Sequence, residues 1–256
     1  MNKIYQLISG NANRLTGNYA KSIIAFLLFF AGFFNTVNAQ VTLTASAGIP
    51  AGSYTNLRLA FDAINTGAHQ GDIVININAN TLEGTTPATL NSSDADPASY
   101  SSITIQPTAN NISISGNPAD GFGVIQLNGS DNVTINGLNT GGNSLTIANT
   151  TVAATSGTST IRFIGGATNN TITNSIIQGS GTMSVATNGA TIFFSTDANT
   201  ANGNDNNTIS NCDIGPGGAN LPTKAILGNG STTTTAIGYS GIVITNNNIF
   251  DYFGAA

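Results

Sequence analysis

Short runs of alternating apolar and polar residues recur along the chain from Ile103 onward. Such alternation is typical of β-strands that bury one face. One phrase returns four times: polar residues flank a central isoleucine, a bend follows, and a further apolar residue comes after the bend. The central isoleucines are Ile135, Ile172, Ile209 and Ile244, at spacings of 37, 37 and 35 residues. A period of this length indicates stacked structural repeats.

A second apolar strand precedes the phrase in most copies, and earlier rungs are expected upstream. The paired apolar positions are Ile103 and Ile105, Ile112 and Ile114, Ile125 and Leu127, Ile161 and Phe163, and Ile192 and Phe194. If each repeat forms one circuit, Val133 and the four central isoleucines line one interior, about 4.8 Å apart per coil. Asparagine at the bend can adopt the left-handed backbone conformation and stack with its equivalents. A repeat that spans more than one circuit is the alternative.

The region before the repeats predicts a different local structure. Residues 41–44 form a short predicted strand, residues 54–65 an amphipathic helix, and residues 72–78 a strongly alternating strand. The uncovered end of a β-stack exposes backbone donors and acceptors that can recruit other chains. A helix followed by strands at this place therefore predicts a cap.

Composition supports an all-β protein. Charged residues make up 7% of the chain, which contains 36 Asn, 35 Thr and 30 Gly, and Glu83 is the only glutamate. Asn, Thr and Gly are weak helix formers that favour turns and strands. Because 40% of the residues are hydrophobic, the chain can fill a core and is expected to be ordered.

Residues 1–39 have the pattern of a secretory signal peptide. Lys3, Arg14 and Lys21 precede an apolar run at 23–34, and a small-residue cleavage site ends at Ala39. A membrane anchor is the competing interpretation, but the run is about a dozen residues long where a span takes about 20. Cleavage leaves three basic residues against eleven acidic ones, a net charge of -8. That balance argues against nucleic-acid binding, and no membrane span is expected after cleavage.

The repeated phrase resembles a known fold family. Asn207-Thr208-Ile209-Ser210-Asn211-Cys212-Asp213-Ile214 and its counterparts are similar to the right-handed parallel β-helix of the pectate-lyase-like superfamily. Residues 60–65, 71–77 and 102–107 are similar to the N-terminal cap of large secreted repeat proteins of Bacteroidetes-type bacteria. Those proteins often end in a surface-sorting domain. The resemblance implies secretion to the outer surface of a Gram-negative bacterium.

These observations predict three segments. They are a signal peptide at 1–39, an N-terminal helix-containing cap at 40–100, and right-handed parallel β-helix repeats at 101–256. The last rung begins at Ile249 and Phe250, shortly before Ala256, so we expect a chain that is cut short. Its final rung should then expose Ile244, Ile249 and Phe250 and associate end to end with other copies.

Few residues carry candidate chemistry. Polysaccharide lyases of the β-helix family use a basic residue and usually calcium, and in the repeats only Arg162 and Lys224 are basic. Arg162 lies between two inward positions and should point outward. Asp197, Asp205 and Asp213 lie in and after an Asn-rich loop that is expected to be a solvated turn, and the alternative is that they are calcium ligands. No other cofactor is expected.

The single histidine and the single cysteine restrict the chemistry further. His69 occupies a Gly-Ala-His-Gln-Gly segment and is expected in an exposed turn. One histidine cannot form a multi-histidine zinc site, and His69 would have to be the histidine of any Ser-His-Asp triad. Cys212 cannot form an internal disulfide and is expected to be a small buried or turn residue.

The favoured interpretation is a secreted or cell-surface stalk or adhesion module without catalysis, whose partners are glycans or other cell-surface components. The alternative is a polysaccharide-active β-helix that acts on acidic glycans. Ice binding is a minor alternative, because Thr171 and Thr173 are followed in the next repeat by Thr208 and Ser210. The row then changes to Val243 and Thr245, so it is not maintained.

Overall fold

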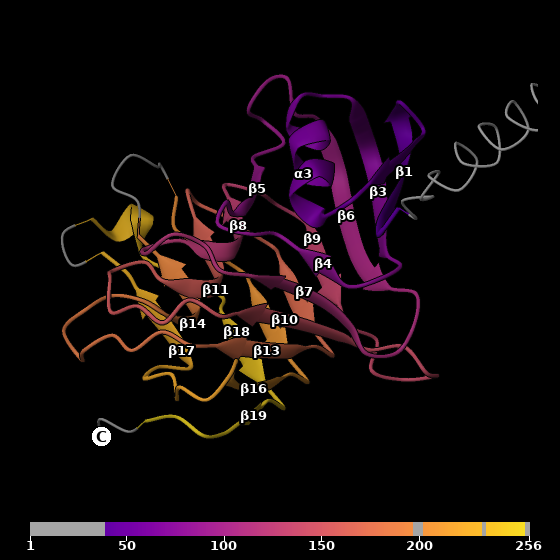
Figure 1. Ribbon diagram of the computed structural model, residues 1–256. Coiled ribbons are helices and arrows are strands. Elements are labelled where there is room, and N and C mark those ends of the chain that lie inside the picture. Colours follow the sequence, from indigo (N-terminus) through magenta and orange to yellow (C-terminus); the bar gives the residue numbers. More distant parts are fainter. Residues whose placement is uncertain (1–38, 197–201, 232–233, 254–256) are drawn as a thin grey trace, which may run out of the picture. The chain divides into compact units, whose positions relative to one another are not determined.

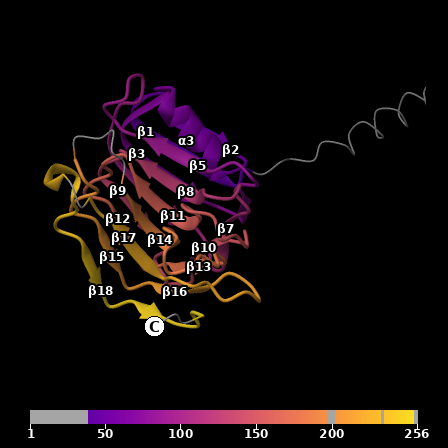
Figure 2. The ribbon, with the colours of Figure 1, turned by 90° about the vertical axis from the view of Figure 1, so that its left-hand side faces the viewer.

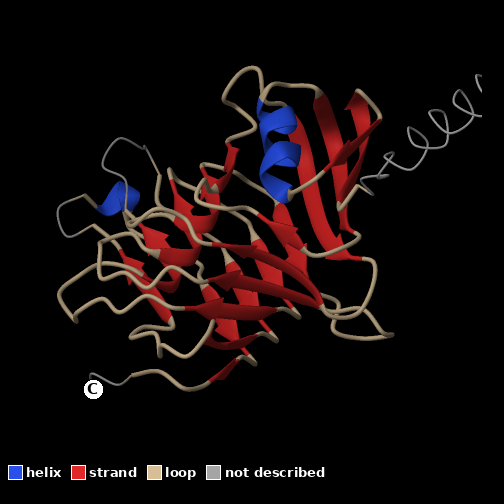
Figure 3. Ribbon diagram, viewed as in Figure 1, coloured by secondary structure: helices blue, strands red, loops and turns tan. Residues whose placement is uncertain are grey.

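The computed structural model describes residues 39–196, 202–231 and 234–253, and the predicted signal peptide lies outside these ranges except for its last residue. The strands form three sheets, which we call A, B and C (Figures 1 and 3). Sheet A contains β1 (Val41–Gly48), β2 (Ala51–Tyr54), β3 (His69–Ile77), β6 (Tyr100–Pro107), β9 (Val133–Asn136), β12 (Thr171–Thr173), β15 (Thr208–Ser210) and β18 (Val243–Thr245). Sheet B contains β4 (Thr81–Leu82), β7 (Ile112–Gly116), β10 (Leu145–Asn149), β13 (Ile176–Gly179), β16 (Asp213–Pro216) and β19 (Asn248–Ile249). Sheet C contains β5 (Ala88–Asn91), β8 (Gly123–Asn128), β11 (Ser159–Ile164), β14 (Ala190–Ser195) and β17 (Ile226–Asn229).

The chain visits sheets A, B and C in turn and forms a parallel β-solenoid of about five turns. Successive coils stack from β3 to β18 in Figure 2. Ile135 pairs with Ile172, Ile172 with Ile209, and Ile209 with Ile244. The 37-residue repeat is therefore one circuit, and the predicted solenoid is confirmed.

Inward side chains of the three sheets make one continuous core. Isoleucines stack in sheets A and B, and Phe163 stacks on Phe194 in sheet C with ring centroids 4.5 Å apart. Burying each such side chain stabilises the fold by roughly 1.5–3 kcal/mol. Ile244 keeps the predicted register but is 49% exposed, because no described coil packs on it. Ile249 and Phe250 are likewise partly exposed.

Asparagines turn the chain at both ends of the short sheet A strands. Asn174, Asn211 and Asn246 have positive φ at the bend after the central isoleucine, as predicted. A second series precedes the strand, where Asn132, Asn169, Asn206 and Gly241 all have positive φ. Asparagine tolerates this left-handed conformation better than most residues, so one residue can turn the chain sharply at each corner.

Next to the second series, buried asparagine side chains connect the coils. Asn170 and Asn207 are fully buried. The Asn170 Oδ1 accepts the backbone N–H of Val133 at 2.9 Å, and its Nδ2 donates to the Ser130 carbonyl at 2.9 Å. One coil later, the Asn207 Oδ1 accepts the N–H of Asn170 at 2.9 Å. Each amide therefore satisfies backbone groups of the preceding coil that would otherwise be buried without a partner.

The N-terminal end is covered by α3 (Leu57–Asn65) and by an antiparallel meander of β2, β1 and β3. The helix buries Leu57, Ala60, Phe61 and Ile64, in agreement with the predicted amphipathic pattern. It begins three residues later than predicted, because Asn56 caps it by accepting the N–H of Leu59 at 3.1 Å. A single turn of 3₁₀-helix, Thr235–Ile237, lies in the last coil.

Glu83 provides a second set of hydrogen bonds to the N-terminus of the helix. Its carboxylate accepts the N–H groups of Leu57 at 3.0 Å and Arg58 at 2.8 Å, and the hydroxyl of Thr81 at 2.9 Å. A carboxylate there is favoured by the helix dipole. Burial nevertheless dominates and raises the pKa of Glu83 above its ordinary value of 4.5.

The prediction for His69 was wrong. It begins β3 and is 1% exposed, because β1 continues to Gly48 and pairs with the start of β3. The imidazole Nδ1 donates to the Ile49 carbonyl at 2.6 Å, and Nε2 accepts the Tyr54 hydroxyl at 2.5 Å. His69 thus fastens the turn between β1 and β2 onto β3.

Replacing a buried corner asparagine should cost far more stability than replacing its exposed neighbour. We expect Asn170→Ala to lower the free energy of unfolding by about 2–5 kcal/mol, because two buried backbone groups lose their partners. Asn169→Gly, at a position with φ of 57°, should change it by less than about 0.5 kcal/mol. Denaturant unfolding of both variants measures this, and equal losses would contradict the assigned roles.

Glu83 should make stability depend on pH. A raised folded-state pKa means that this contribution is fully present below the unfolded-state pKa and is lost as pH rises through the folded-state value. Glu83→Gln resembles the protonated form and should remove that decline. The measurement is the difference between the two proteins' unfolding free energies across pH 3–8. A difference that does not vary with pH would contradict the prediction.

Candidate functional site

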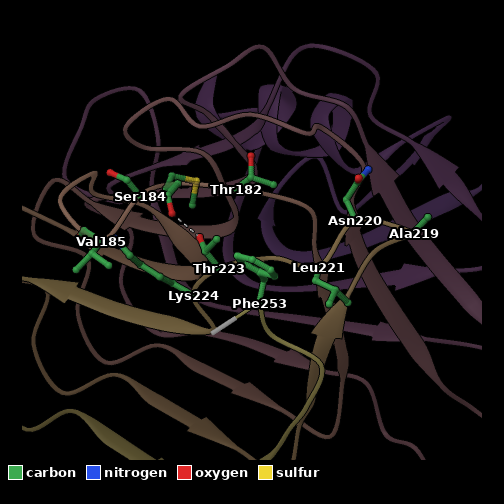
Figure 4. Close-up of a pocket in the computed structure, with 10 residues that line it drawn as sticks. Thr182, Ser184, Val185, Ala219, Asn220, Leu221, Thr223, Lys224 and Phe253 are labelled. Atoms are coloured by element: carbon green, nitrogen blue, oxygen red, sulfur yellow. Dashed lines mark hydrogen bonds between the residues drawn. The ribbon is translucent and has the colours of Figure 1, made fainter. Parts of the chain in front are cut away.

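A cleft of about 690 Å³ opens among the loops that connect sheet B to sheet C. Its walls come from three successive coils: residues 182–185, residues 219–224, and Phe253 after β19. Figure 4 shows the side chains around it. Met183, Val185, Leu221 and Phe253 supply apolar surface, and the polar groups include Ser184, Asn220 and Lys224.

Hydrogen bonds between these loops extend the coil-to-coil stacking beyond the strands. The N–H of Thr223 donates to the Gly181 carbonyl at 3.0 Å, and its hydroxyl donates to the Met183 carbonyl at 2.7 Å. The N–H of Phe253 donates to the Pro222 carbonyl at 2.9 Å. The walls of the cleft are therefore held to one another by backbone contacts.

Lys224 lies on this cleft. Its Nζ donates to the carbonyl oxygens of Val185 at 3.1 Å and Thr187 at 2.6 Å, which belong to the preceding coil. The lysine thus holds the loop between β13 and β14 in place. Two of the three ammonium donors are used in this way, and one is left for another acceptor.

Arg162 lies elsewhere, on the outer face of sheet C. Its neighbours Ile161 and Phe163 are fully buried, so the predicted outward direction is confirmed. The guanidinium donates to the Gly121 carbonyl at 3.1 Å and to the Ser195 hydroxyl at 2.9 Å. It also lies 5.6 Å from the ring centroid of Phe193, in the range of a cation–π contact. The structure does not bring the two candidate bases together, since Arg162 does not line the cleft.

Two of the candidate calcium ligands, Asp205 and Asp213, lie at different corners of the solenoid. Asp197 lies outside the described residues. The Asp205 Oδ1 accepts the N–H of Ser240 at 2.6 Å, and the Asp213 Oδ1 accepts the Nδ2 of Asn248 at 3.0 Å. Each described carboxylate therefore joins its coil to the next one. Among the described residues, no group of three or more His, Cys, Asp and Glu side chains is positioned to hold a metal.

The prediction of a solvated turn was wrong for Asn204 and Asn207 of the Asn-rich loop, whereas Asn206 is exposed. Asn204 and Asn207 are buried. The Asn204 Oδ1 accepts the N–H of Ala167 at 2.9 Å, and its Nδ2 donates to the Ser195 carbonyl at 2.9 Å. The two side chains point inward, where each amide accepts a backbone N–H and donates to a backbone carbonyl.

Cys212 is buried in the solenoid interior, as predicted. Its Sγ lies 3.2 Å from the Ser210 carbonyl and 3.7 Å from the Ile172 carbonyl. Burial raises the pKa of the thiol. The equivalent positions in adjacent coils are Ser175 and Asn247, so this corner takes a small or amide side chain that bonds to the backbone.

Two surfaces were missed in the sequence. The cleft is built from loops outside the repeated phrase, which carry no periodic signal. The threonine row on the outer face of sheet A is longer than expected. Thr104 pairs with Thr134, Thr134 with Thr171, and Thr171 with Thr208, in four successive coils. Aligning the two 30-residue repeats from Ile75 to Ile135 would have revealed the row.

The chain matches no known family model, no curated protein and no solved structure. Within the described ranges, the helices are too short or too polar to cross a bilayer.

Cys212 should be unreactive in the folded protein. The thiol is buried and its raised pKa keeps it protonated near neutral pH, whereas the thiolate is the nucleophile. We expect iodoacetamide to label Cys212 only as fast as the protein unfolds, with full labelling in denaturant as the control. Stoichiometric labelling within minutes under native conditions would show that the coil stack opens at this corner.

Proposed function

We propose that this chain is a secreted or cell-surface stalk or adhesion module, built on a β-helix of the pectate-lyase-like kind and without catalytic activity. Glycans or other cell-surface components are the proposed partners, on the outer surface of a Gram-negative bacterium. The solenoid supports this proposal because each coil contacts only its neighbours, and such stacks make long, even surfaces.

One observation carries the non-catalytic part. Both basic side chains of the repeats are engaged in bonds that hold loops to the solenoid: Lys224 with the carbonyls of Val185 and Thr187, Arg162 with that of Gly121. A general base must lie within hydrogen-bond reach of the proton that it removes and must be able to accept it. The Lys224 ammonium and the Arg162 guanidinium donate to backbone carbonyls, and this arrangement suits the positioning of loops better than the removal of a proton from a substrate.

The outer face of sheet A supports distributed binding. Two in-register rows cross it: Thr104, Thr134, Thr171 and Thr208 in one, Asn136, Thr173, Ser210 and Thr245 in the other. These side chains are uncharged and can donate and accept hydrogen bonds. Many small contacts along such a face would give avidity without a single dominant residue.

The competing function is an enzyme that acts on acidic polysaccharides. It is tested by incubating the purified chain with pectin, alginate and chondroitin and following unsaturated uronides by ultraviolet absorbance. We expect no turnover, and no effect of calcium chelation, because neither basic residue is placed as a base. Turnover that disappears in Arg162→Ala or Lys224→Ala, in variants shown to remain folded, would overturn the proposal and establish the lyase.

Ice binding is the second alternative, and the four in-register threonines are the observation that favours it. Valine occupies the same row at both ends, as Val74 before Thr104 and Val243 after Thr208. The hydroxyl row therefore spans four coils of the solenoid, and the neighbouring row is mixed in residue type.

A further inference from the structure

Exposed large apolar side chains are concentrated on one corner of the solenoid. Four successive B-to-C connections and the segment after β19 each carry one at this corner, and they are Phe122, Val152, Val185, Leu221 and Phe253. Val185 is 73% exposed and Phe253 is 66% exposed. Single exposed apolar residues need no explanation, but a series that converges on a cavity marks an interaction site.

The last three members of this series line the cleft, together with the buried side chain of Met183. The cavity volume of about 690 Å³ falls within the roughly 300–1,000 Å³ typical of small-molecule sites. The walls are fixed to each other by the hydrogen bonds of Thr223 and Phe253 described above. A ligand would thus meet a formed apolar surface with a few polar groups at defined places.

Lys224 gives this surface its charge selectivity. Among the described residues that line the cleft, it is the one that carries a charge. No described carboxylate pairs with it, and its two partners are neutral carbonyl oxygens. A positive charge beside apolar walls favours a negatively charged ligand over a neutral or cationic one.

We propose that the cleft binds a small amphiphilic carboxylate, with its aliphatic chain on Val185, Leu221 and Phe253 and its carboxylate on the ammonium of Lys224. A single ammonium with one remaining donor suits a monoanion. A phosphate or sulfate ester would require additional donors of the kind that arginine or a helix N-terminus provides. This site is independent of the proposed function, because a stalk or an enzyme could carry it.

The test is calorimetric titration of the purified chain with hexanoate, octanoate and decanoate below their micellar concentrations, and with octan-1-ol and octyltrimethylammonium. We expect saturable binding of one carboxylate per chain, strengthened up to about fourfold for each methylene that becomes buried. Octan-1-ol should bind at least tenfold more weakly than octanoate, and the cation should not bind. Equal affinity for octanoate and the cation, or no saturable binding of any carboxylate, would overturn the proposal.

Variants locate the site. Leu221→Ser changes the wall of the cleft and leaves Lys224 in place. It should weaken the binding of octanoate at least tenfold. The matched control is Val152→Ser, an exposed valine on an earlier loop that does not line the cleft. Lys224→Met should remove the preference for octanoate over octan-1-ol, with thermal unfolding as the check on folding. If Leu221→Ser binds octanoate as the parent does, the ligand lies elsewhere and the proposal is wrong.

Discussion

Everything in this protein depends on the hydrogen bonds that each coil forms with the coils before and after it. From β4 onward, the parallel strands of sheets A, B and C pair only with their equivalents one circuit away, and β3 also pairs with β1 of the cap. The buried amides of Asn170 and Asn207 add to that pairing at the corners, beside backbone hydrogen bonds such as the one from the Asn169 N–H to the Asp205 carbonyl. Since the chain has a single cysteine, no internal disulfide supplements these contacts. Apolar burial supplies the stability, and the inter-coil bonds fix the register.

The architecture was predictable because one corner has a constant length. In the last three coils, five residues separate the inward position of sheet A from that of sheet B: Ile172 to Ile177, Ile209 to Ile214, and Ile244 to Ile249. That constancy is what makes the phrase visible. The other corners vary in length, so their contents give no periodic signal.

The errors share a physical cause. His69 and Asn204 of the Asn-rich loop were expected in solvent because polar residues flanked by glycine or asparagine usually form exposed turns. Here both are buried, because a neighbouring segment supplies partners: Tyr54 and Ile49 for His69, Ala167 and Ser195 for Asn204. Such partners are distant in sequence, and local composition does not contain them. The cleft escaped prediction for the same reason, since Val185, Leu221 and Phe253 meet only through stacking.

The variable corners have an evolutionary consequence. The circuits from Ile75 to Ile105 and from Ile135 to Ile172 differ by seven residues, yet both end in register on sheet A. Residues can therefore be inserted into a connection between two sheets without shifting the inward isoleucines of sheet A out of register. The solenoid separates a regular buried frame, in which substitutions are costly, from a series of loops that can lengthen independently. New surfaces, such as the one around Lys224, can arise on this frame by insertion while the core stays unchanged.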